Sequence, residues 1–385
     1  MLYHLTDWLQ SLGLDWPGMG LMHYLSFRAM LAAVFSMLIA FLAGGKIIKW
    51  LQKHQIGETI RDLGLEGQMQ KKGTPTMGGI IIIIALMGSA LLVCRLDSIY
   101  TLLLMATTLW CGGIGFADDY IKVFKHNKEG MSEKGKLILQ FGLGLFVALT
   151  VCVSPDIPTD KLVTTIPFVK AHEFDYSWLS PFRGQLGVYC SWGIYMIMII
   201  LVVLACSNGT NLTDGMDGLA SGTSAIVGVA IGVMAWLSGD VIDAQYLNIM
   251  YIPGAGEVAI FMAAFVGALI GFLWYNTFPA QVFMGDSGSL TIGGIIGVSA
   301  VLVRKELILP LLCGIFLMES LSVIIQRTHF KYTKRKYGEG RRVFLMAPLH
   351  HHYQKKGIPE PRIVTRFWII GIILAVSTLA VLKIR

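Results

Sequence analysis

Four polar motifs interrupt the apolar stretches of this chain, and their residue types are those that bind metal ions and phosphate groups. They are the pair Asp118–Asp119, the run 208–218 (NGTNLTDGMDG), the run 276–288 (NTFPAQVFMGDSG) and the basic loop that contains the histidines 350–352. Carboxylates at the edge of a bilayer are costly unless they serve a function. Several of them in one chain predict a metal-dependent site for a charged substrate.

The acidic pair Asp118–Asp119 closes the third apolar stretch of the chain. Carboxylates are poorly placed there, because the carboxyl end of a helix favours cations. Asp118 and Lys122 are four residues apart and therefore share one helix face. A solvated helix end is the structural alternative, but the electrostatic mismatch favours binding of a divalent cation or acceptance of a proton.

The second motif repeats asparagine and aspartate at every third position: Asn208, Asn211, Asp214 and Asp217. The pattern differs from a calcium-binding EF-hand loop, because the closing glutamate and its spacing are missing. Between two membrane helices we expect a ligand loop, whose side chains contact ribose hydroxyls, a base amide or Mg²⁺. A plain turn is the alternative.

The third motif places Asp286 between Gly285 and Ser287, at the start of the eighth apolar segment. Its structural alternative is a helix N-cap. Phe283 lies three residues earlier, and an exposed aromatic ring there suits stacking on a nucleobase.

The fourth motif comprises three consecutive histidines, His350, His351 and His352, in the loop 327–366 with eleven basic residues. Three adjacent side chains cannot all point one way, so the run does not match a zinc site. Imidazoles among basic residues suit a pyrophosphate or phosphate ligand. Glu319 lies inside the ninth apolar segment, and we expect it to form a hydrogen bond within the bundle.

A further stretch, 68–79 (QMQKKGTPTMGG), offers Lys71 as a phosphate donor and glycines that let the backbone approach a ligand or another helix. It is not a P-loop, because the GxxxxGK[ST] spacing is absent. Its alternative is a helix start with Thr74 or Thr76 as the cap.

The elements that must position these motifs are membrane helices. The chain has 385 residues, of which 55% are hydrophobic and 14% charged, against about 25% charged residues in soluble proteins. Ten apolar segments approach the length of about 20 residues that spans a bilayer. They are 25–45, 77–96, 99–117, 137–155, 188–206, 219–238, 257–275, 288–303, 307–326 and 363–382. The eighth is short, and the ninth contains Pro310, Gly314 and Glu319.

The basic residues predict the orientation. If ten helices alternate, one side of the membrane carries 22 of the 31 lysines and arginines, and the positive-inside rule makes that side cytoplasmic. All the polar motifs then face the cytoplasm, and both termini are periplasmic. We expect one polytopic domain over 1–385, with an interfacial segment at 1–24, a periplasmic loop at 156–187 and a basic cytoplasmic loop at 327–362.

Five motifs in this order resemble the phospho-N-acetylmuramoyl-pentapeptide-transferase family: KKGTPTMGG, FADDYIK, NLTDGMDGL, NTFPAQVFMGDSGSL and MAPLHHH. The resemblance implies an all-α integral membrane protein of ten helices, with a Mg²⁺-dependent site on the cytoplasmic side of the bacterial inner membrane. It implies a homodimer that joins UDP-N-acetylmuramoyl-pentapeptide to undecaprenyl phosphate, giving lipid I and UMP. No nucleic-acid partner is expected.

The resemblance also implies roles for single residues. Asp286 matches the Mg²⁺ ligand, and Asp118 and Asp119 match catalytic carboxylates, with Asp118 favoured as the base on the lipid phosphate. His350 matches a catalytic residue that contacts nucleotide or pyrophosphate, and Phe283 would stack near uracil. The remaining matches are expected to bind substrate: Lys71, Thr76, Lys122, Asn211, Asp214, Asp217, Asn276, His351 and His352.

Two other functions fit part of the pattern. A transferase of N-acetylglucosamine 1-phosphate in the same superfamily would share the aspartate motifs. An ion-coupled transporter also carries intramembrane carboxylates, but it typically shows an inverted repeat and charges near the midplane. The sequence leaves open a one-step displacement and a two-step path through a phospho-aspartate.

Overall fold

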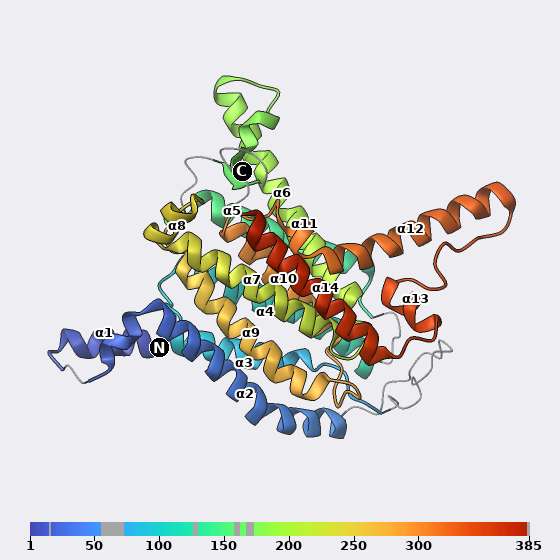
Figure 1. Cartoon of the computed structure of the whole chain (residues 1–385), viewed down its shortest axis with the longest axis horizontal. Helices are drawn as coiled ribbons and strands as arrows, with labels where there is room; N and C mark the ends of the chain where they lie inside the picture. Colours follow the sequence, from blue (N-terminus) through green and yellow to red (C-terminus); the bar gives the residue numbers. More distant parts are fainter. Residues whose placement is uncertain (15–16, 55–72, 126–129, 158–161, 167–172, 383–385) are drawn as a thin grey trace.

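The computed structural model describes residues 1–385 except 15–16, 55–72, 126–129, 158–161, 167–172 and 383–385. Its long helices lie side by side in one bundle (Figure 1). Each of the ten predicted apolar segments contains helix. The helices are α2 (Leu25–His54), α3 (Gly79–Val93), α4 (Ile99–Phe124), α5 (Glu133–Val153), α6 (Gly184–Thr213), α7 (Leu219–Gly239), α9 (Ala255–Asn276), α10 (Gly285–Leu302), α12 (Gly314–Tyr337) and α14 (Glu360–Val381).

Eight helices in the described part of the chain are long and apolar enough to cross a membrane: α2, α4, α5, α6, α7, α9, α10 and α14. The protein is therefore an all-α, multi-pass membrane protein. Helix α3 has 15 residues and is shorter than these eight. The ninth predicted segment is broken into a short helix α11 (Leu309–Leu312) and α12, which begins after Cys313.

Helix α10 occupies the centre of the bundle, and every residue from Ser287 to Leu302 is buried. It packs against α4, α6 and α3. Its sequence is rich in glycine and serine, which allow close helix contacts in membrane proteins. The eighth predicted segment can be short because other helices surround it, so its length does not have to match the thickness of the bilayer.

Two predicted loops contain more helix than the sequence indicated. Helix α6 continues to Thr213, so Asn208 and Asn211 are helical and only 214–218 forms the turn. Side-chain bonds to the helix support this continuation, including that from Asn208 Nδ2 to Leu204 O at 2.8 Å. In the basic loop, α12 extends to Tyr337 and projects from the bundle, and α13 (Leu349–Lys355) follows (Figure 1).

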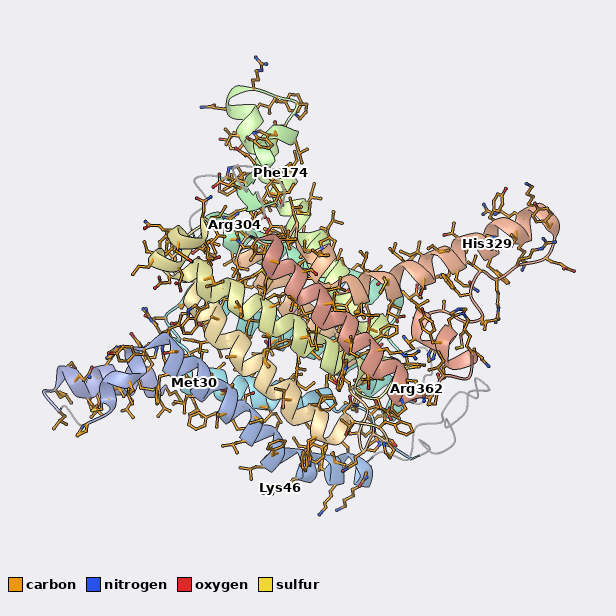
Figure 2. All side chains as sticks on the ribbon, viewed as in Figure 1. Met30, Lys46, Phe174, Arg304, His329 and Arg362 are labelled. Atoms are coloured by element: carbon orange, nitrogen blue, oxygen red, sulfur yellow. The ribbon has the colours of Figure 1, made fainter. Side chains whose placement is uncertain are left out.

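The predicted loop 156–187 also contains secondary structure. Strands β1 (Val163–Thr165) and β2 (Glu173–Asp175) form an antiparallel pair, followed by the 3₁₀ helix η3 (Tyr176–Leu179) and the start of α6 at Gly184. The segment docks on the turn after α10, where Phe174 and Arg304 lie at the same end of the molecule (Figure 2). Lys305 Nζ donates to Thr165 Oγ1 at 2.6 Å in this buried contact.

The N-terminal helix α1 (Leu2–Ser11) has no buried residue, and Trp8 and Leu12 are largely exposed. It projects sideways from the bundle next to the start of α2 (Figure 1). The exposed apolar side chains of α1 support the predicted interfacial position of 1–24, which stays a prediction.

The docking contact predicts a dependence of stability on pH. Burial lowers the pKa of the Lys305 ammonium from 10.5 to about 8. Between these values the unfolded chain binds more protons than the folded protein, so stability rises with pH there. We expect the Tm of the wild type in detergent to rise, relative to that of Lys305→Met, from pH 8 to 10. A Tm difference that does not change with pH would contradict this account.

Candidate active site

The end of α4 and the start of α10 are joined through Asp119. The backbone N–H of Asp286 donates to Asp119 Oδ1 at 3.1 Å, and that of Ser287 donates to Oδ2 at 2.9 Å. The first N–H groups of a helix lack partners within the helix, and its amino end favours negative charge. The Asp119 carboxylate therefore fixes the first turn of α10 against the last turns of α4.

Glycines make this approach possible. A Cβ on Gly115, one turn before Asp119, would collide with the backbone of Asp286. A Cβ on Gly79 would collide with Gly288, so the start of α3 also touches α10 through the backbone. Gly285 has a φ of 72°, which favours glycine. A Cβ there would lie 2.7 Å from Asp119 Oδ2 and 3.0 Å from Thr76 Oγ1.

The Asp286 side chain points to two lysines. Its Oδ2 lies 2.6 Å from Lys136 Nζ and 3.2 Å from Lys122 Nζ. Both ammonium groups also contact Asp118 Oδ2, Lys122 at 2.5 Å and Lys136 at 2.9 Å. Asp118 is fully buried, and its Oδ1 accepts a hydrogen bond from Met131 N at 2.7 Å. The structural alternative, in which Asp286 is the N-cap of α10, does not hold, because the N-cap is Met284 and Asp286 lies in the first turn.

The second oxygen of Asp286 is held from α6. Asn211 Nδ2 donates to Asp286 Oδ1 at 3.0 Å and to Ser289 Oγ at 2.9 Å. Four helices, α4, α5, α6 and α10, therefore meet at one carboxylate. Three of the predicted motifs, Asp118–Asp119, 208–218 and 276–288, therefore each contribute a side chain to this centre. Their predicted position on the same side of the membrane is consistent with this contact.

The three carboxylates form a group that could hold a cation. Asp118, Asp119 and Asp286 each offer an oxygen, and these oxygens lie within 4.8 Å of one another. Hard oxygen ligands of this kind suit Mg²⁺. The side chain of Asp286 is 16% exposed whereas that of Asp118 is fully buried, so Asp286 is the carboxylate most open to a ligand.

Two turns beside the centre are braced by buried side chains. Asn276 Oδ1 accepts from Gly218 N at 3.0 Å, and its Nδ2 donates to Val282 O at 3.0 Å. Asp217 Oδ2 accepts from Ala280 N at 3.0 Å. Both residues are almost fully buried. They tie the 214–218 turn to the segment 277–284. Contact of Asp217 and Asn276 with substrate stays a prediction.

The segment before α3 pairs with the same region. Phe283 N donates to Pro75 O at 2.9 Å, and Gly78 N donates to Phe283 O at 2.8 Å. The N-cap of α3 is Gly78, without a side-chain cap, so neither Thr74 nor Thr76 caps the helix. Thr76 is buried, while the Phe283 side chain is partly exposed.

The three histidines point in different directions, as expected. His350 is buried, and its Nδ1 lies 3.1 Å from Glu319 Oε2 while its Nε2 faces Gly215. His351 Nδ1 lies 3.2 Å from Gln354 Oε1, and His352 Nδ1 accepts from Leu345 N at 3.1 Å. The predicted hydrogen bond of Glu319 is present, but its donor is His350 N of α13, at 3.2 Å, rather than a residue of another bundle helix. The imidazole of His350 is enclosed by protein in the structure, and its contact with substrate stays a prediction.

Of the predicted site residues, the structure brings together Asp118, Asp119, Lys122, Asn211 and Asp286, with Thr76 beside Gly285. Lys71 lies outside the described residues, and Asp214 is half-buried directly after α6.

Sequence reasoning missed Lys136, because it was one of several lysines in a basic stretch. The sequence feature that could have identified Lys136 is Gln140, four residues later. It is a polar residue on the same helix face of an otherwise apolar segment.

The chain is similar to known proteins over its whole length. Residues 101–304 match the model described as glycosyl transferase family 4, and residues 71–83 match signature 1 of phospho-N-acetylmuramoyl-pentapeptide-transferase. The chain is 53% identical to the phospho-N-acetylmuramoyl-pentapeptide-transferase of Parabacteroides distasonis and 52% identical to that of Flavobacterium psychrophilum. It is 46% identical to that of Bacteroides thetaiotaomicron, and all three alignments cover 100% of both chains.

The contact of α4 with α10 yields a test with a matched control on the same helix. Gly115→Ala places a Cβ against the Asp286 backbone, whereas a Cβ on Gly113 meets no atom within 4 Å. We expect Gly115→Ala to lower transferase activity by about ten-fold or more, since a misplacement of about 1 Å can cost about 100-fold. Gly113→Ala should keep nearly all activity. Equal activities of the two purified variants would show that this contact does not position the site.

Proposed function

This chain belongs to the phospho-N-acetylmuramoyl-pentapeptide-transferase family, and we propose that it performs the family's reaction at the carboxylate centre of α4 and α10. The protein transfers the phospho-N-acetylmuramoyl-pentapeptide group in peptidoglycan synthesis. Its substrates are UDP-N-acetylmuramoyl-pentapeptide and a polyprenyl phosphate lipid. We propose that the lipid is undecaprenyl phosphate and that the products are lipid I and UMP.

One observation carries the assignment to this centre. The Asp286 carboxylate is held by Lys122 and Lys136 on one oxygen and by Asn211 on the other. Such a cluster of cations and carboxylates fits transfer between a lipid phosphate and a diphosphate. Full-length similarity to proteins named for muramoyl transfer supports this reaction over N-acetylglucosamine 1-phosphate transfer and over ion-coupled transport.

We propose that Mg²⁺ is the cofactor and that Asp286 is its principal protein ligand. The fit rests on the three carboxylate oxygens within 4.8 Å and on the partial exposure of Asp286. When bound, the ion supplies neutralisation of the donor diphosphate and of the charge that develops on UMP.

Lys122 and Lys136 supply the remaining positive charge. Both lie between Asp118 and Asp286, so they can hold phosphate oxygens beside the carboxylate centre. An oxygen of the lipid phosphate attacks the β-phosphorus of the donor. The bond from this phosphorus to the bridging oxygen breaks, and that oxygen leaves with UMP. Charge repulsion between the two phosphate groups is the barrier that these residues lower.

The buried position of Asp118 favours a supporting role. Its two oxygens are engaged by Met131 N and by both lysines. A lipid phosphate has a second pKa near 6, as in phosphoserine, and is largely ionised at about pH 7. We therefore propose that Asp118 orients Lys122 and Lys136 rather than serving as the base. Its enclosure also supports a single displacement over a phospho-aspartate intermediate.

The residues that bind the donor are proposed from the sequence motifs. The partly exposed Phe283 is proposed to stack on uracil. Four further residues are proposed to lie near the nucleotide or pyrophosphate: Lys71, Thr76, Asp214 and His351. Asp217, Asn276, His350 and His352 are proposed to hold the surrounding turns, because their side chains bond within the protein.

We propose ten membrane helices, a cytoplasmic site, periplasmic termini, a homodimer and location in the bacterial inner membrane. Lys46 and Arg362 lie toward one end of the bundle and Arg304 toward the other (Figure 2). The basic end is the one to which α4 and α6 bring Asp118 and Asn211. The excess of basic residues there supports a cytoplasmic assignment.

The metal assignment is tested by Asp286→Asn. A neutral amide binds Mg²⁺ poorly, so we expect transfer of the phospho-sugar to undecaprenyl phosphate to fall by at least about 100-fold, as is typical of losing one preorganised charge in an active site. The Mg²⁺-dependent rise in Tm should also disappear. Activity within a few-fold of the wild type at saturating Mg²⁺ would remove Asp286 from the metal site.

The orientation is tested by labelling single cysteines in intact cells. All six native cysteines would first be replaced. Lys334→Cys, on the projecting part of α12, should react only with a membrane-permeant reagent. Gln245→Cys, on the short helix α8 (Val241–Leu247), should react with an impermeant one. Labelling of Lys334→Cys from outside would place the basic face away from the cytoplasmic donor and would refute the proposed orientation.

A further inference from the structure

A buried polar network lies one helical turn away from the carboxylate centre. Gln140 of α5 is fully buried, and its Nε2 donates to Ser207 Oγ at 3.1 Å. Its Oε1 accepts from Asn208 Nδ2 at 2.9 Å. Ser207 Oγ in turn donates to Leu290 O of α10 at 3.4 Å. One amide therefore connects α5 with two neighbouring residues of α6, and through Ser207 with α10.

The network is in register with the residues that hold Asp286. Gln140 is four residues after Lys136, so the two share a face of α5. Ser207 is four residues before Asn211 on α6. Lys136 contacts Asp286 Oδ2, and Asn211 contacts Asp286 Oδ1. The two helices that Gln140 joins are thus the two that grip opposite oxygens of this carboxylate.

We propose that Gln140 is a positioning residue, which fixes α5 against α6 so that Lys136 and Asn211 hold Asp286 in its ligand orientation. The inference rests on the proposed role of Asp286 as a Mg²⁺ ligand. It extends that role to a residue that touches neither the carboxylate nor the substrate.

The physical reason is that apolar contacts do not fix the relative position of two helices as a hydrogen bond does. Farther along the same pair, Gly144 packs closely on Ile200. Such contacts are non-directional and tolerate sliding. A buried amide, in contrast, must keep its partners or lose the free energy of desolvation. Gln140 therefore defines one register of α5 on α6.

The test compares Gln140→Leu with Ser89→Ala as the control. Ser89 is also buried, and its Oγ donates to Ala32 O at 2.7 Å, which joins α3 to α2. Loss of partners around a metal ligand typically costs about 10- to 100-fold in metal affinity or activity. In Gln140→Leu we expect the Mg²⁺ concentration for half-maximal thermal stabilisation to rise by about ten-fold, and kcat to fall by about ten-fold. The KM for the donor should stay within about two-fold of the wild-type value. Ser89→Ala should lower Tm while leaving the Mg²⁺ dependence unchanged.

A double-mutant cycle with Lys136→Met separates positioning from general stability. If Gln140 acts through Lys136 and Asn211, Gln140→Leu should lower kcat much less in the Lys136→Met background than in the wild type, because residues of one network are not additive. Additive losses would overturn the proposal. If Gln140→Leu does not fold, Ser207→Ala removes the bonds of Ser207 Oγ to Gln140 and to Leu290 O but keeps the bond between Gln140 and Asn208. This variant should shift the Mg²⁺ dependence in the same direction.

Two other outcomes are distinguishable. A Gln140→Leu variant that lowers Tm but binds Mg²⁺ as the wild type does, as Ser89→Ala should, would reduce Gln140 to a structural role. A wild type whose Tm does not respond to Mg²⁺ would instead refute the metal assignment of Asp286. In that case the double-mutant cycle of Gln140→Leu and Lys136→Met, measured by kcat, still tests whether Gln140 positions Lys136, because this measurement does not depend on metal binding.

Discussion

The contact of the Asp119 carboxylate with the first N–H groups of α10 is the interaction on which the site depends. It places a negative charge at the amino end of a central, buried helix, where the helix favours it. The same contact sets the direction of Asp286, which lies in that first turn. The small volume of Gly79 and Gly115 is a condition of this arrangement, because a side chain at either position would separate the helices.

Charge compensation explains how so many ionised groups are tolerated at this depth. Burying a single carboxylate is expensive, and its pairing must be close and complete. Asp118 meets this requirement with two lysines and a backbone N–H. Because Lys136 comes from α5, the charge balance of α4 and α10 depends on the docking of a third helix. Packing and electrostatics are therefore coupled throughout the centre.

The polar residues divide by what they touch. Asp286, Lys122 and Lys136 contact one another at the carboxylate centre, where we propose that the phosphate groups react. Asn276 and Gln140 bond only within the protein in the described structure, and they fix turns or helices that carry the first group. The motif 276–288 contains both kinds, Asn276 and Asp286, and only the contacts of their side chains distinguish them.

The sequence by itself determined the membrane class, the ten apolar segments and the residue types of the centre, because hydrophobicity and charge are local properties of the chain. It also indicated that Asp118 and Lys122 share a face. Only the tertiary structure decided that Asp217 and Asn276 brace turns, that His350 is enclosed beside Glu319, and that Lys136 belongs to the centre. These facts depend on contacts between residues far apart in the chain, and such contacts arise only when the helices pack.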